Sequence, residues 1–188
     1  IHLIGDSLVM PKGMSLDFNG IAQGFTVDLI ASYLESQNIN RYFIEIGGEI
    51  VAKGKNDDEK IWRIGVDKPS EDIDDNARFQ FILDLEDKAL ATSGNYRKFY
   101  QKDGVKYSHI INPFTGFPAQ NRLLSATVIH DNCILADAYA TAFMIMGVKE
   151  TKKFVSQYSD IEIYLVYTGK KGEWKTYTSP NMLERIIN

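Results

Sequence analysis

The chain has a single cysteine among its 188 residues, together with only five prolines and three histidines. One cysteine cannot form an internal disulfide, and no Cys and His residues have the spacing of a zinc site. No apolar run approaches the roughly 20 residues that a membrane-spanning helix needs. There is no basic cluster, and the formal net charge is −4, which does not favour general nucleic-acid binding. These absences exclude disulfide-stapled and zinc-binding classes and direct attention to the polar residues inside apolar segments.

The composition is that of an ordinary globular protein. Hydrophobic residues make up 44% of the chain and charged residues 24%, close to average usage. A length of 188 residues is within the range that one hydrophobic core can serve. We therefore expect one domain over residues 1–188.

Hydrophobic alternation and turn residues predict many strands and few helices. Ile21, Phe25, Leu29 and Tyr33 recur at a spacing of four and predict one apolar face of a helix. Gly47-Gly48 separates two strand patterns, as in a tight hairpin. The fold class is therefore α+β with a mainly antiparallel sheet. Helices are expected at residues 21–37, 134–146 and 148–158, and strands at 1–10, 41–46, 50–53, 62–66, 79–85, 89–92, 96–100, 106–111, 124–130, 161–167 and 173–178.

Asp137 is the most informative single residue because it lies inside an apolar helical pattern that follows a cap signal at Asp131-Asn132. A buried carboxylate is costly unless it is paired, hydrogen-bonded or bound to a metal. Thr141 follows four residues later, so both oxygens project from one face of the helix. Oxygen ligands of this kind suit Mg²⁺. The alternative is an aspartate on the solvent side of the helix, with Thr141 beside it by chance.

Three other segments could contribute to a site, and each also has an ordinary structural explanation. Residues 17–25 place glycines at a helix start, which suits an anion or simply a tightly packed helix. His109 ends a strand at a structured loop, where it could exchange protons or bond a carbonyl. Residues 91–96 are small and carry hydroxyl groups, so they could line a cleft or form a bend. No Ser/His/Asp arrangement identifies a nucleophile within the chain.

Taken together and in order, five segments resemble the ApbE family of FAD:protein FMN transferases, whose fold is related to the T-fold. They are residues 16–28, 41–48, 91–97, 109–118 and 136–141, and the similarity extends over nearly the whole chain. Two positions depart from the common pattern. Gln23 stands where many members have Lys or Glu, and Asn112 stands where many have Asp.

The resemblance implies a specific site. Mg²⁺ would be bound by the side chains of Asp137 and Thr141 and by the backbone carbonyl of Gly20. FAD, as substrate, would contact Asp17, Gln23 and the backbone at Ile111. His109 would be the catalytic residue that assists transfer.

The resemblance also implies a reaction, partners and a location. FMN would pass from FAD to a threonine or serine of a target flavoprotein, with release of AMP. Two alternatives remain open: a Mg²⁺-dependent FAD pyrophosphatase that gives FMN and AMP, and a flavin-binding protein without turnover. The chain would be the C-terminal part of a longer periplasmic or extracytoplasmic lipoprotein. No nucleic-acid partner is expected, and contact with a membrane would come only through an anchor that this chain lacks.

Overall fold

The structure is a computed structural model that describes residues 1–68, 79–95, 99–102, 105–108, 110–119 and 121–187. It is an α+β fold in which every pairing between the strands described is antiparallel. The fold class expected from the sequence is therefore confirmed.

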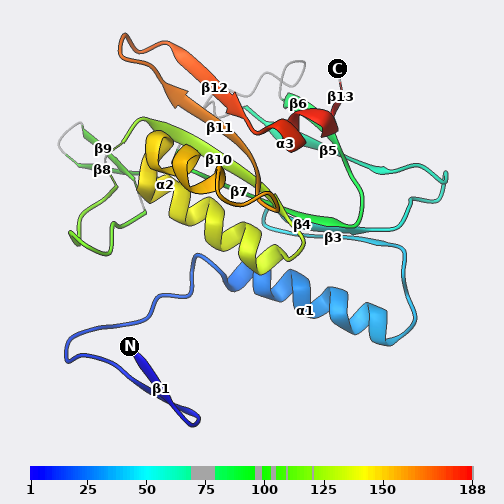
Figure 1. The fold of residues 1–188 in the computed structure, drawn as a ribbon, viewed down its shortest axis with the longest axis horizontal. Coiled ribbons are helices and arrows are strands. Elements are labelled where there is room, and N and C mark those ends of the chain that lie inside the picture. Colours follow the sequence, from blue (N-terminus) through cyan, green and yellow to red (C-terminus); the bar gives the residue numbers. More distant parts are fainter. Residues whose placement is uncertain (69–78, 96–98, 103–104, 109, 120, 188) are drawn as a thin grey trace.

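A six-stranded sheet with the order β12-β11-β10-β7-β4-β3 forms the centre of the molecule (Figure 1). Strands that follow one another in the sequence are neighbours in the sheet in three cases: β3/β4, β10/β11 and β11/β12. Strand β7 pairs with both β4 and β10 and so joins the two halves of the sheet. Gly47 and Gly48 both have positive φ, at 67° and 109°, as the predicted hairpin between β3 and β4 requires. The strands of this sheet are β3 (Tyr42–Ile46), β4 (Glu49–Lys53), β7 (Lys88–Gly94), β10 (Leu123–His130), β11 (Glu162–Thr168) and β12 (Trp174–Thr178).

Three smaller groups of strands accompany the central sheet. A three-stranded sheet has the order β13-β6-β5, and two separate hairpins are formed by β1/β2 and by β8/β9. Their bounds are β5 (Trp62–Asp67), β6 (Phe79–Leu85), β13 (Ile186–Ile187), β1 (His2–Ile4), β2 (Ser7–Val9), β8 (Phe99–Lys102) and β9 (Val105–Ser108).

Successive side chains of the central strands point to opposite faces of the sheet, so buried apolar residues form a core on each face. On one face, Ala91 and Ala126 pack against Ala136 and Ala140 of helix α2 (Cys133–Val155). On the other face, residues such as Leu90 and Val166 pack against the three-stranded sheet and helix α3 (Pro180–Arg185). The short side chains on the α2 face allow the helix to approach the sheet closely, which brings polar groups of α2 within reach of β7.

Helix α1 (Ala22–Ser36) forms where the sequence predicts it, but it does not present the expected face to the core. Its buried residues are Gly24, Val27 and Ala31. The stripe defined by Phe25, Leu29 and Tyr33 is 54 to 65% exposed. Both sides of α1 are therefore apolar, and only the side with small residues packs against the body of the protein.

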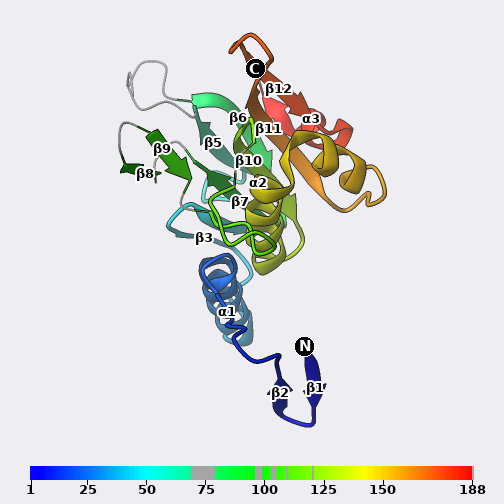
Figure 2. The ribbon, with the colours of Figure 1, turned by 90° about the vertical axis from the view of Figure 1, so that its left-hand side faces the viewer.

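The N-terminal residues also differ from the prediction of one strand over residues 1–10. They form a hairpin in which Gly5 has a φ of 56°, so the chain reverses after β1. This hairpin lies beyond α1 and away from the sheets (Figure 2). Its apolar side chains, including Leu3, Ile4 and Leu8, are exposed.

Near the C-terminus, the predicted break at Gly147 is confirmed. This glycine has φ 73° and ψ 173°, so the two predicted helices form one element with a kink.

The sequence patterns do not predict α3 or β13, which follow β12. Helix α3 begins with Pro180 at its first position and is fixed by Arg185, whose guanidinium donates to both carboxylate oxygens of Glu162 at 2.7 and 2.9 Å.

Candidate active site

The contact between α1 and α2 brings Asp137 and Thr141 close to the residues at the start of α1. At its centre is Gly24, where a Cβ atom would lie 2.5 Å from the carbonyl oxygen of Cys133 and 2.9 Å from Cβ of Asp137. No side chain fits in that space, so glycine lets the two helix backbones meet. The amide of Gly24 donates a hydrogen bond to Oδ2 of Asp137 at 3.0 Å.

A second contact fixes the start of α2. Asp28 of α1 accepts hydrogen bonds from the amides of Cys133 at 3.0 Å and Ile134 at 2.9 Å. Asn132 occupies the N-cap position, as predicted, but its side chain makes no capping bond. The cap therefore comes from another helix, 105 residues away, and the negative charge also suits the positive end of the helix dipole. A cap supplied from so far along the chain leaves no local signal.

Asp137 is 4% exposed, so the alternative of a solvent-facing aspartate is wrong. Burial raises the pKa of this carboxyl above its usual value, and the hydrogen bond from the Gly24 amide acts in the opposite direction. In the described part of the chain, the hydrogen bond to this carboxylate comes from the Gly24 amide, and burial of a carboxylate with few donors costs free energy. A bound cation would offset that cost.

Thr141 lies one helical turn beyond Asp137 and contacts Gly20. A Cβ atom at Gly20 would be 3.0 Å from Cγ2 and 3.4 Å from Oγ1 of Thr141. The Thr141 hydroxyl is 3.1 Å from Oγ of Ser93 in β7. The structure thus brings Gly20, Asp137 and Thr141 to one edge of the α1–α2 contact, with Gly20 opposite Thr141 and Gly24 opposite Asp137.

The candidate metal ligands are all oxygen atoms, and only Asp137 among them supplies a carboxylate. Within the described ranges, no group of three or more His, Cys, Asp or Glu residues could hold a metal by itself. A site of Asp137, Thr141 and a backbone carbonyl is consistent with Mg²⁺, which usually keeps waters or substrate phosphates as its other ligands. The residues present therefore fit this ion better than zinc or copper, which favour histidine and cysteine.

The buried thiol of Cys133 is close to this site but is not a suitable nucleophile. Burial raises the pKa of Cys133 far above its usual value, and the carboxylates of Asp28, Glu49 and Asp137 raise it further. Because the thiolate is the reactive form, this cysteine is inert at neutral pH.

The predicted FAD contacts Asp17 and Gln23 flank the start of α1. Asp17 is exposed, and its Oδ1 accepts a hydrogen bond from the amide of Asn19 at 2.9 Å, which turns the chain toward the helix. Gln23 is exposed in the first turn, and its side chain occupies the space where a Cβ atom of Gly47 would be. The side chain of Gln23 therefore covers the β3–β4 turn.

The third predicted contact, Ile111, lies in an ordered loop. It forms an isolated bridge with Pro118 and is 49% exposed. Asn112 shapes this loop, because its Oδ1 accepts from the Phe114 amide at 2.9 Å and its carbonyl accepts from Gly116 at 2.9 Å. An asparagine side chain supplies the same acceptor as aspartate, so this departure from the family pattern preserves the turn. His109, the predicted catalytic residue, lies outside the described residues.

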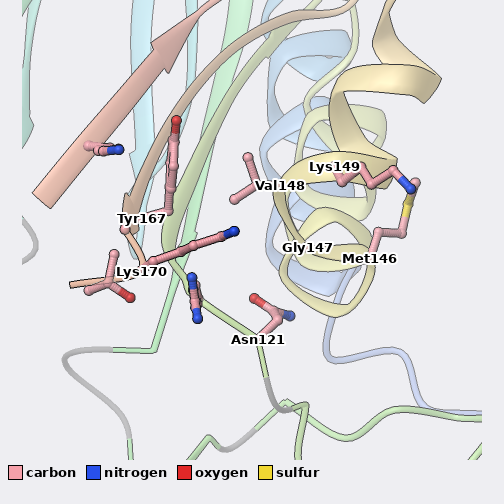
Figure 3. Close-up of a pocket in the computed structure, with 11 residues that line it drawn as sticks. Asn121, Met146, Gly147, Val148, Lys149, Tyr167 and Lys170 are labelled. Atoms are coloured by element: carbon pink, nitrogen blue, oxygen red, sulfur yellow. The ribbon is translucent and has the colours of Figure 1, made fainter. Parts of the chain in front are cut away.

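A hollow of about 510 Å³ lies away from these residues, beside the break in α2. Figure 3 shows Lys170 extending across it, with Tyr167 on one side and Val148 on the other. None of its lining residues is a predicted site residue. They are Asn121, Arg122, Met146, Gly147, Val148, Lys149, Tyr167, Thr168, Gly169, Lys170 and Lys175.

Comparisons of the sequence and the fold with known proteins identify the family. The family model described as "ApbE family" matches residues 2–165. A protein of Vibrio cholerae named FAD:protein FMN transferase is 44% identical over 164 residues, which are 87% of this chain and 48% of the relative. A protein of the same name from Escherichia coli is 31% identical over 173 residues, covering 92% of this chain and 48% of the relative.

Solved structures agree. The flavin transferase ApbE of Vibrio cholerae superposes with a TM-score of 0.77 at 41% identity and covers 90% of this chain and 52% of that one. The ApbE protein of Thermotoga maritima gives a TM-score of 0.79 at 29% identity, over 94% of this chain and 55% of that one. The chain spans about half the length of the relatives it matches. In the part of the chain that the structure describes, no helix has the length and hydropathy of a membrane span. The resemblance stated from the sequence is confirmed, and the chain belongs to the ApbE family.

Proposed function

We propose that this chain forms the metal- and FAD-binding part of a Mg²⁺-dependent FAD:protein FMN transferase. The observation that carries the proposal is the placement of Asp137, a buried carboxylate with a raised pKa, beside the Thr141 hydroxyl and against Gly20. The names of the relatives supply the reaction class. Their activity is a proposal for this chain, because the chain spans 48% of each of them.

The proposed ligands of Mg²⁺ are Oδ of Asp137, Oγ1 of Thr141 and the carbonyl of Gly20. When bound, the ion would offset negative charge on the pyrophosphate of FAD and on the departing phosphate of AMP. Asp17, Gln23 and the Ile111 backbone are the proposed FAD contacts. Gln23 lies in the first turn of α1, where the positive end of the helix dipole favours an anionic group.

The proposed transfer breaks one phosphate–oxygen bond and forms another. The hydroxyl oxygen of a threonine or serine on the target flavoprotein attacks the phosphorus of the FMN half of FAD. The bond to the AMP phosphate breaks, and AMP leaves with the bonding electrons. His109 is the proposed acceptor of the hydroxyl proton. Cys133 takes no part, since burial keeps its thiol protonated.

The test is to incubate the chain with FAD, Mg²⁺ and a peptide that carries the acceptor threonine. We expect AMP release together with an FMN adduct on the peptide, seen by mass spectrometry. AMP release that needs no acceptor would instead support a pyrophosphatase. Tight FAD binding with no AMP after long incubation would support a flavin-binding protein.

We also propose that these residues are the C-terminal part of a longer extracytoplasmic protein that has a lipid anchor outside this chain. The exposed apolar stripe of α1, with Phe25, Leu29 and Tyr33, supports the first half of this proposal, because stable proteins rarely leave such a stripe uncovered. A thiol introduced by Leu29→Cys should react quickly with a maleimide in this chain and slowly in the longer protein. Equal rates in both would contradict the proposal.

A further inference from the structure

Ser93 lies at the end of β7, in the segment of small and hydroxyl residues to which the proposed function assigns no role. Its Oγ is 3.1 Å from Oγ1 of Thr141, and this contact joins residues 48 positions apart. Ser93 is paired with Ala126 of β10 in the central sheet. Its position is therefore fixed by the sheet rather than by α2.

The contact exists because the helix and the sheet meet through alanines. Ala91 and Ala126 of the sheet and Ala136 and Ala140 of α2 belong to one buried cluster, and all four are fully buried. Larger residues here would move α2 away from β7. The hydroxyl of Ser93 would then lose contact with Thr141.

The hydroxyl of Thr141 is directed differently from those of Thr26 and Ser32 in α1. Thr26 and Ser32 of α1 donate to the carbonyl oxygens four residues earlier, at 2.7 and 2.9 Å. This back-bonding is the usual behaviour of Ser and Thr inside a helix. Within the described part of the chain, the hydrogen-bond partner of Thr141 Oγ1 is Ser93, not a carbonyl of its own helix.

Two contacts hold the Thr141 side chain in one rotamer. Its methyl group is directed at Gly20, where an added Cβ atom would be only 3.0 Å away. Its hydroxyl is held at Ser93. A hydroxyl that binds a cation through an oxygen lone pair must donate its proton elsewhere, and the Oγ of Ser93 can accept it. Partners that orient metal ligands in this way commonly change metal affinity or activity 10- to 100-fold when removed.

We propose that Ser93 is a positioning residue of the metal site: it accepts the proton of the Thr141 hydroxyl and keeps the lone pairs of that oxygen aimed at the cation. This inference rests on the proposed function, which makes Thr141 a metal ligand. In this proposal Ser93 acts through Thr141 and is neither a metal ligand nor a contact of FAD.

The experiment measures Mn²⁺ binding to the chain, with Mn²⁺ as the spectroscopic probe of a magnesium site and electron paramagnetic resonance to count the free ion. We expect Ser93→Ala to raise the dissociation constant about 10-fold. Ser93→Thr keeps the hydroxyl and should remain within about threefold of the parent chain. In the flavin-transfer assay, Ser93→Ala should raise the Mg²⁺ concentration for half-maximal rate and leave the rate at saturating Mg²⁺ nearly unchanged.

Thr92 provides a matched control on the same strand. Its Oγ1 is 2.9 Å from Oγ1 of Thr127, so Thr92→Val also breaks a hydroxyl pair between neighbouring elements. It should leave the Mn²⁺ dissociation constant unchanged, even if its urea midpoint falls as far as that of Ser93→Ala. An equal loss of Mn²⁺ affinity in both variants would mean that Ser93 acts only through stability, and the inference would be wrong.

A further variant separates the inference from the proposal beneath it. If the parent chain binds Mn²⁺, Asp137→Ala loses binding and Ser93→Ala binds normally, the metal site stands and the role of Ser93 is refuted. If the parent chain shows no saturable binding up to millimolar Mn²⁺, or Asp137→Ala binds as well as the parent, the metal assignment fails and the inference fails with it.

Discussion

Replacing Asp28 tests the contact on which the geometry of the site depends. Its carboxylate accepts two amide hydrogen bonds at the start of α2, at 3.0 and 2.9 Å, and so takes the place of a local N-cap. Asp28→Ala removes both bonds and the charge at the positive end of the helix dipole. The site residues Asp137 and Thr141 follow in the next turns of the same helix, so a displaced start of α2 would move them as well.

The magnitude follows from three contributions. Loss of an N-cap costs about 1 kcal/mol and up to about 2, and loss of a favourable charge at a helix N-terminus costs about 0.3 to 1 kcal/mol. The N-cap figure already includes the two amides that lose their acceptor, while alanine recovers about 0.5 kcal/mol of helix propensity in α1. We expect Asp28→Ala to lower the free energy of unfolding by about 1 to 2.5 kcal/mol.

Urea unfolding followed by circular dichroism measures this loss. Asp28→Asn keeps one acceptor oxygen and should lose about half as much free energy. Asp6→Ala, in the exposed β1–β2 turn, is the control and should change the value by less than about 0.5 kcal/mol. A loss below about 0.5 kcal/mol in Asp28→Ala would refute the view that α1 caps α2.

The remaining predictions concern helix packing and the buried carboxylate. Gly24→Ala should destabilise the chain by about 1 to 3 kcal/mol in urea unfolding, despite the better helix propensity of alanine, because the new Cβ atom would meet the Cys133 carbonyl at 2.5 Å; a stabilised variant would show that the helices do not touch there. Val27→Ala should lower the free energy of unfolding by about 2 kcal/mol because Val27 is fully buried, whereas Leu29→Ala, at an exposed position, should lower it by less than about 0.5 kcal/mol. The reverse order of the two losses would mean that the opposite side of α1 packs inward. Burial raises the folded-state pKa of Asp137 above its unfolded value of 3.8, so the metal-free chain should lose stability as the pH rises from below 3.8 through that raised pKa. Asp137→Asn should remove this loss, which unfolding measured as a function of pH would detect as a flatter profile; an unchanged profile would contradict the burial of Asp137.

Local patterns in the sequence predicted much of the fold but not its long-range contacts. The alternation along the strands of the central sheet, the Gly47-Gly48 turn and the break at Gly147 are local signals, and all three are confirmed. The single strand expected over residues 1–10 is instead a hairpin. The apolar stripe of α1 showed where a helix forms but not which side packs inward. The inward side is decided by Gly24, whose lack of a side chain matters only because α2 crosses at that point.

The residues of the site likewise divide into those with a local signal in the sequence and those without one. Asp137 and Thr141 could be selected because a carboxylate and a hydroxyl one turn apart in an apolar helix are unusual. From the residues alone, a solvent-facing aspartate is the better explanation, and only the fold excludes it. The contribution of Asp28 and the contact between Ser93 and Thr141 depend on residues 105 and 48 positions away. No pattern within a short window of sequence could reveal them.

The proposed magnesium site on Asp137 is tested most directly by Mg²⁺-dependent release of AMP from FAD by the chain and its variants, with the acceptor peptide present. We expect Asp137→Ala to abolish release at every Mg²⁺ concentration that saturates the parent chain. Asp131→Asn, an exposed aspartate near the start of the same helix that pairs with Lys88, should retain it. Activity in Asp137→Ala equal to that of Asp131→Asn at ordinary Mg²⁺ would contradict the account.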